Sequence, residues 1–186
     1  IFYASDPSKE ETQRYLTELF LIKEFSLLKD HVLIMKTHTQ DNGIITNYSY
    51  YDASKPENVI LIGDVRQKKK IASEDFHIFD NFDFNAAIRS SSGFLTTSST
   101  SILQALVLGV KTGIVDMFNN GYFDYLASKD ASILVNDSDS LINFLETQKI
   151  LISERVLNYC GLKKEKEEFD MGMHVINCIA KAHLDS

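Results

Sequence analysis

Four consecutive hydroxyl residues, Ser98-Ser99-Thr100-Ser101, separate an apolar strand pattern from an apolar helix pattern. The first N–H groups of a helix have no partner inside the helix, and the helix dipole is positive at that end. Hydroxyl and free N–H groups together can bind a phosphate, and small side chains let a ligand approach the backbone closely. We therefore predict a phosphate site at this turn, with simple helix capping by the same hydroxyls as the alternative.

A histidine follows another apolar strand pattern, in the sequence Lys36-Thr37-His38. An imidazole changes charge near neutral pH, so it could donate a hydrogen bond to a phosphate oxygen or protonate a leaving group. Lys36 would add an ammonium group to the same site. The alternative for His38 is a surface or structurally bonded histidine, which is the more common case.

Further polar residues follow the apolar strand pattern at Thr112–Val115. We predict that Asp116, Asn119 and Tyr122 contact a bound ligand. The alternative is ordinary turn chemistry, because Asn119-Asn120-Gly121 is also a favourable turn sequence.

Short, mostly continuous apolar stretches alternate with helical patterns, which is typical of parallel strands covered by helices on both faces. We predict an α/β domain with a mainly parallel sheet of about six strands between two helix layers. The predicted strands are Ile1–Ala4, Val32–Met35, Val59–Ile62, Gly93–Thr97, Thr112–Val115 and Ile133–Val135. In such a sheet a ligand binds beyond the carboxyl ends of the strands, where the three groups of polar residues above are expected.

Helical spacing of apolar residues predicts the helices between these strands. The predicted helices are Ser8–Lys29 with Ser8 as its cap, Phe84–Ser91, Ser101–Leu108, Tyr122–Ser128 and Ser138–Glu146. We expect one domain over residues 1–186, with an α/β core at 1–150 and C-terminal helices at 151–186.

The composition is that of a globular protein, with 186 residues, 44% hydrophobic and 24% charged. The net charge of −7 disfavours nucleic acid as a partner, because a phosphate backbone needs a cationic surface. The two cysteines, Cys160 and Cys178, form no CxxC pair, which favours a reducing, cytoplasmic location. The longest apolar run, Ile102 to Val110, is far shorter than the roughly 20 residues that span a bilayer.

A local basic cluster follows the third predicted strand, at Arg66, Lys68, Lys69 and Lys70. We expect a solvated loop here, since such runs are common and salt screens them. The alternative is attraction of an anionic partner, or peripheral contact with the inner membrane.

The segment from Gly93 to Asp116 resembles the nucleotide-sugar-binding half of GT-B glycosyltransferases. In that segment a strand leads into Ser98–Ser101, an apolar helix ending at Gly109, and a strand ending in Asp116. Together with Lys36-Thr37-His38, it resembles bacterial capsule and surface-polysaccharide glycosyltransferases. These include the sialyltransferase and Kdo-transferase groups, which use a His-Pro motif and a Ser-Ser/Thr motif to hold a nucleotide phosphate.

The resemblance implies a Rossmann-like domain, one half of a GT-B fold, that binds a CMP- or UDP-linked sugar without a metal or other cofactor. Ser98–Ser101, Gln104 and Lys36 would hold the nucleotide, and His38 would act in catalysis. Asp116, Asn119 and Tyr122 would contact the sugar or the base. The acceptor, a glycan or lipid-linked glycan, would bind an N-terminal domain that this chain lacks, so the chain would bind and not turn over. Two residues depart from the pattern: Thr39 replaces the proline of His-Pro, and Gln104 replaces a glutamate.

Two other functions stay open. A non-hydrolysing sugar-nucleotide epimerase resembles the same fold and needs no acceptor. A non-catalytic α/β binding module, such as a response-regulator-like domain, would carry an acidic cluster after its first strand, where only Asp6 stands. For a metal, the nearest acidic pair is in Asp80-Asn81-Phe82-Asp83, and its spacing is poor.

Overall fold

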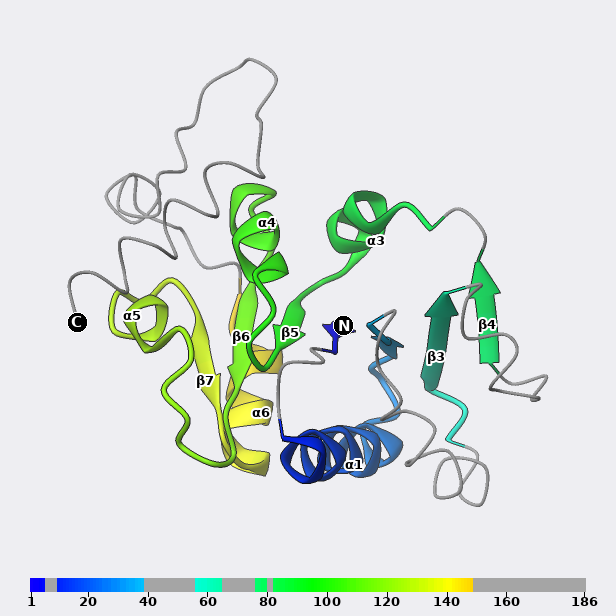
Figure 1. Cartoon of the computed structure of the whole chain (residues 1–186), viewed down its shortest axis with the longest axis horizontal. Helices are drawn as coiled ribbons and strands as arrows, with labels where there is room; N and C mark the ends of the chain where they lie inside the picture. Colours follow the sequence, from blue (N-terminus) through cyan, green and yellow to red (C-terminus); the bar gives the residue numbers. More distant parts are fainter. Residues whose placement is uncertain (6–9, 39–55, 65–75, 80–81, 149–186) are drawn as a thin grey trace, which may run out of the picture.

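The computed structural model describes residues 1–5, 10–38, 56–64, 76–79 and 82–148 (Figure 1). Within these residues it has a sheet of seven parallel strands in the order β4-β3-β2-β1-β5-β6-β7. The strands are β1 (Phe2–Ala4), β2 (Leu33–Lys36), β3 (Val59–Asp64), β4 (Phe76–Phe79), β5 (Phe94–Thr96), β6 (Thr112–Val115) and β7 (Ile133–Val135). The predicted α/β class and parallel sheet are confirmed.

Six of the seven strands were predicted from their apolar runs, two of them with the observed ends and four with ends that differ by one or two residues. The missing one is β4, which lies at an edge of the sheet beside β3. An edge strand has a neighbour on one side only, so the apolar pattern that marks a central parallel strand is not required there.

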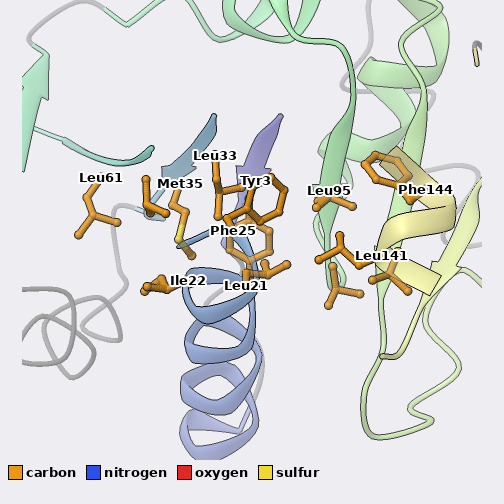
Figure 2. Packing of buried hydrophobic residues seen from close by; sticks show 13 residues of the cluster. Tyr3, Leu21, Ile22, Phe25, Leu33, Met35, Leu61, Leu95, Leu141 and Phe144 are labelled. Atoms are coloured by element: carbon orange, nitrogen blue, oxygen red, sulfur yellow. The ribbon is translucent and has the colours of Figure 1, made fainter. Parts of the chain in front are cut away.

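Helices cover both faces of the sheet. They are α1 (Glu11–Leu27), α3 (Phe84–Ser90), α4 (Ser101–Val107), α5 (Asp124–Ala127) and α6 (Ser138–Glu146). One buried cluster joins α1 and α6 to the strands, and Figure 2 shows Leu21, Ile22 and Phe25 of α1 against Tyr3 and Met35. The other cluster holds α3, α4 and α5 against the opposite face, so the domain has three layers.

Two predicted helix starts are wrong. The N-cap of α1 is Glu10 rather than Ser8, and acidic residues at a helix start are favoured by the helix dipole. The start of α5 is later than Tyr122, because Phe123 has a left-handed backbone with φ of 58° and serves as the N-cap. The predicted helices at 151–186 and the basic cluster at 66–70 lie outside the described residues.

The end of α1 depends on a side chain from another element. Leu28, the C-cap of α1, is followed by no glycine, and the last turn of the helix contains no basic residue. Instead, the Asn58 amide donates hydrogen bonds to the carbonyl oxygens of Phe25 at 2.6 Å, Leu28 at 3.1 Å and His31 at 2.9 Å. Asn58 therefore ties the end of α1 to the start of β3.

Two glycines make room for one aromatic ring under α6. A Cβ atom at Gly93 would lie 2.7 Å from the Phe144 ring, and one at Gly113 would lie 2.6 Å from Leu95 Cδ2 and 3.0 Å from Phe144. Phe144 and Leu95 are both fully buried. The ring can pack onto β5 and β6 because both positions lack a side chain.

Candidate functional site

The order of the strands defines where a ligand would bind. From β1 the chain builds β2, β3 and β4 on one side, and then β5, β6 and β7 on the other (Figure 1). In open parallel sheets, ligands bind at the carboxyl ends of the strands where the winding direction changes. Here that point lies between β1 and β5.

Three buried hydroxyl residues form a row at this edge of the sheet. Ala4 is paired with Lys36 on one side and with Thr96 on the other. The next residues along the three strands, Ser5, Thr37 and Thr97, therefore follow at one level, and they are 4%, 1% and 4% exposed. Within the described part of the chain, the hydroxyl of Thr97 has no hydrogen-bond partner. This buried polar group at the edge of the sheet was not predicted from the sequence.

The predicted phosphate turn begins directly after this row. The Ser99 hydroxyl donates to the Ser101 hydroxyl at 3.0 Å and accepts from the Ser101 N–H at 3.3 Å. Thr100 is the N-cap of α4, yet it is exposed and makes no side-chain capping bond. Ser98 is half-buried. The Ser99 hydroxyl therefore caps the start of α4, whereas the Thr100 hydroxyl does not.

The start of α4 differs electrostatically from the other described helix starts. Each of those has a carboxylate at the N-cap or in the first turn: Glu10 for α1, Asp83 for α3, Asp124 for α5 and Asp137 for α6. Hydrogen bonds from the Ser140 hydroxyl and N–H lower the pKa of Asp137, the N-cap of α6. The first turn of α4 contains no acidic residue. Its dipole is therefore not neutralised by its own side chains.

Asp116 stabilises the loop that follows β6. Its carboxylate is buried and accepts hydrogen bonds from the Asn120 N–H at 2.9 Å and the Gly121 N–H at 2.9 Å. The Asn120 side chain also donates to Gln13 of α1 at 3.2 Å. Asp116 thus folds the loop 116–121 and holds it beside α1, while contact of this residue with a sugar or base stays a prediction.

Two other residues of this loop are open to solvent. Asn119 has a left-handed φ of 53°, and Tyr122 is 43% exposed. Their predicted contact with a sugar or base is untested, but both side chains are accessible for it.

Lys36 and His38 lie at the same edge as the serine turn, but not next to it. Parallel strands are spaced about 4.8 Å apart, and β1 separates β2 from β5, so the two groups are about 10 Å apart. The Lys36 ammonium donates to the Thr37 carbonyl oxygen at 3.1 Å, and both Lys36 and His38 are half-buried. A ligand that spans the switch point could reach both groups. Gln104 is half-buried in α4, and its predicted contact also stays untested.

A buried polar segment of α1 was missed by the sequence analysis. Glu18 is fully buried and accepts a hydrogen bond from the Ser5 hydroxyl at 2.8 Å. Arg14 is 7% exposed. The signal was present in the spacing, because Arg14 and Glu18 continue the stripe of Leu21, Ile22 and Phe25 on one helix face.

Neither a metal-binding cluster nor a membrane-spanning helix is present among the described residues. No group of three or more His, Cys, Asp and Glu side chains there is arranged to hold a metal ion. Asp83, a member of the weak acidic candidate, instead caps α3 by accepting from the Ala86 N–H at 2.9 Å. None of the helices in that part of the chain has the length and apolar character needed to cross a membrane.

Neither a protein-family model nor a curated protein matches the sequence. A solved structure, UDP-GlcNAc 2-epimerase of Methanocaldococcus jannaschii in complex with UDP-GlcNAc and UDP, is similar with a TM-score of 0.51 and 13% sequence identity. The match covers 99% of this chain and 44% of the epimerase chain, so this chain spans less than half of that enzyme. The likeness shows the fold, and the chain is accordingly a Rossmann-like α/β domain of the kind found in that epimerase.

Proposed function

We propose that the chain is the nucleotide-sugar-binding domain of an enzyme and binds the nucleotide phosphate at the switch point between β1 and β5. The observation that carries this proposal is the position of the Ser98–Ser101 turn, which leaves the sheet at that point. The hydroxyl row and the uncompensated start of α4 support it. The fold shared with an enzyme that binds UDP-GlcNAc supports it further.

The predicted site residues other than Asp116 have these roles in the proposal. In the turn, Ser98, Thr100 and Ser101 donate hydrogen bonds to the phosphate and Ser99 orders the turn, while the side chain of Gln104 bonds a ribose hydroxyl. Lys36 neutralises part of the phosphate charge from the β2 side. Asn119 and Tyr122 contact the sugar or the base from the loop after β6.

For the reaction we propose glycosyl transfer. An acceptor hydroxyl, held by a second domain, attacks the anomeric carbon and loses its proton to water, and the bond from that carbon to the phosphate oxygen breaks. His38 stabilises or protonates the departing phosphate, so that no metal is needed. The acceptor is a surface glycan or lipid-linked glycan, in the cytoplasm at the inner membrane.

Epimerisation is the second candidate reaction, and the structural neighbour favours it. The two reactions differ in their need for an acceptor. Product analysis of a protein that contains this chain separates them: an epimerase interconverts sugar nucleotides alone, whereas a transferase releases the nucleotide only when an acceptor is present.

Nucleotide binding is the first test of the proposed function. We expect calorimetric titration of the chain with CMP, UMP, CDP and UDP to detect binding by at least one of them. Cytidine and uridine serve as controls and should bind more weakly, because they lack the phosphate that the turn would contact. Failure of all four nucleotides to bind at millimolar concentration would contradict the proposal for this chain.

Alanine substitutions in the turn separate phosphate binding from helix capping. Because Thr100 makes no capping bond, Thr100→Ala should leave the melting temperature near that of the wild type. If its hydroxyl bonds a phosphate, nucleotide affinity should fall about tenfold, since a hydrogen bond to a charged group contributes roughly 1.5–3 kcal/mol. Ser99→Ala should in addition cost about 0.5–2 kcal/mol of stability, because Ser99 caps the turn.

Ser90→Ala is the matched control for these variants. Ser90 is an exposed hydroxyl residue at the far end of α3, and its hydroxyl donates to the Ala86 carbonyl oxygen at 2.9 Å. Its nucleotide affinity should equal that of the wild type. Unchanged affinity in the Ser98, Ser99 and Thr100 variants would assign the turn to capping alone.

A further inference from the structure

The hydroxyl of Thr96 connects the serine turn to the central strand of the sheet. It donates a hydrogen bond to the Ala4 carbonyl oxygen at 3.0 Å and accepts one from the Ser99 N–H at 3.1 Å. A hydroxyl can make both bonds at once, because it has one hydrogen and two lone pairs. Thr96 is fully buried, and the bond to Ala4 joins residues 92 positions apart.

This arrangement fixes the turn at its base. The Ser99 N–H is held by Thr96, so it points into the protein and is not available to a ligand. With that amide fixed, the backbone on either side, at Ser98 and Thr100, has a defined direction relative to the end of β1. Removing the hydroxyl would leave the Ser99 N–H and the Ala4 carbonyl oxygen without these bonds, and the turn would be free to adopt other conformations.

We propose that Thr96 is a positioning residue for nucleotide binding, which holds the Ser98–Thr100 turn in the conformation that receives the phosphate. The inference rests on the proposed function. Its physical basis is preorganisation: a turn that is already ordered loses less conformational entropy when a ligand binds. Thr96 acts through Ser99 and does not touch the phosphate.

Thr112 provides a matched control one strand away. Thr96 of β5 and Thr112 of β6 are both fully buried in neighbouring strands. Thr112 also donates to a distant carbonyl oxygen, that of Ala131 at 3.0 Å, and shares a hydroxyl contact of 2.6 Å with Ser132. It stands at the amino end of its strand, at the opposite edge of the sheet from the turn.

The test measures UDP affinity and thermal stability in Thr96→Val, Thr96→Ser and Thr112→Val. Valine keeps the shape and strand preference of threonine and removes the hydroxyl. We expect Thr96→Val to lower UDP affinity at least tenfold and Thr96→Ser to restore it to within about threefold of the wild type. Thr112→Val should lower the melting temperature about as much as Thr96→Val does, because each variant removes one buried hydroxyl. Unlike Thr96→Val, it should leave UDP affinity unchanged.

Amide hydrogen exchange in the wild type adds a measurement that depends on no variant folding. The Ser99 N–H should be protected before UDP is added, whereas the N–H group of Thr100 should gain protection only with UDP. An unprotected Ser99 N–H in the free chain, wild-type affinity in Thr96→Val, or an equal loss of affinity in Thr112→Val would each overturn the inference. If the wild type binds no UDP or other nucleotide, the proposed function itself fails, and this inference fails with it.

Discussion

Asn58→Asp is expected to destabilise the domain by about 3–5 kcal/mol at neutral pH, because it places a buried charge where no partner can compensate it. The Asn58 amide donates to the carbonyl oxygens of Phe25, Leu28 and His31, and the residue is 8% exposed. A carboxylate has no hydrogen to donate, and it would face three carbonyl oxygens of like partial charge. Urea unfolding at pH 7 measures the loss.

The pH dependence of N58D distinguishes this mechanism from simple loss of packing. Burial and the three carbonyl oxygens would raise the pKa of the introduced carboxyl in the folded chain above its value in the unfolded chain. As the pH falls, the folded state of N58D therefore binds a proton before the unfolded state does. The difference in unfolding free energy between N58D and the wild type should narrow between pH 7 and pH 4.

Asn143→Asp makes the same chemical change on the exposed face of α6, and it should alter stability by less than about 0.5 kcal/mol. A deficit for N58D that is equally small would show that α1 ends without help from Asn58.

Gly113→Ala is expected to cost about 1–3 kcal/mol, although alanine restricts the unfolded chain more than glycine does. The added methyl group would lie 2.6 Å from Leu95 Cδ2 and 3.0 Å from the Phe144 ring. Both neighbours are fully buried, so neither can move away without disturbing the core. The steric cost therefore exceeds the entropic gain of about 0.4–1 kcal/mol. Thermal and urea unfolding report the change.

A double-mutant cycle tests the cause of this loss. Leu95→Val removes the Cδ2 atom that the new methyl group would strike. In the L95V background, Gly113→Ala should cost at least about 1 kcal/mol less than in the wild type, because the two sites are in contact and their effects are not additive. Simple additivity of the two substitutions would show that the contact with Leu95 is not the source of the strain.

The fold was largely predictable because its central strands are buried on both faces. Continuous apolar runs such as Val59–Ile62 carry that burial in the sequence itself. The edge strand β4 does not, since His77 interrupts the apolar residues of Phe76-His77-Ile78-Phe79 and the segment has one neighbouring strand. The start of α1 was misplaced because serine is the more usual cap, whereas this helix begins with glutamates.

The residue types of the candidate site could be predicted from the sequence, but the hydrogen bonds that hold these residues in place could not. Ser98–Ser101 stand out in the sequence as a run of hydroxyls after a strand. The link from Thr96 to Ala4 depends on the register of β1 against β5, which no local pattern encodes. The same holds for Asn58 at the end of α1 and for Ser5 against Glu18. Each joins residues that only the assembled sheet brings together.

The central place of β1 also has a consequence for how the chain is made. β1 is synthesised before every other strand described here, but its partner β5 follows only after β2, β3 and β4. On the ribosome, the half-sheet β4-β3-β2-β1 can therefore form first, with the N–H and C=O groups along one side of β1 still unpaired. Such an edge can pair with the same edge of another nascent chain. The arrival of β5 both completes the switch point and closes this route to aggregation.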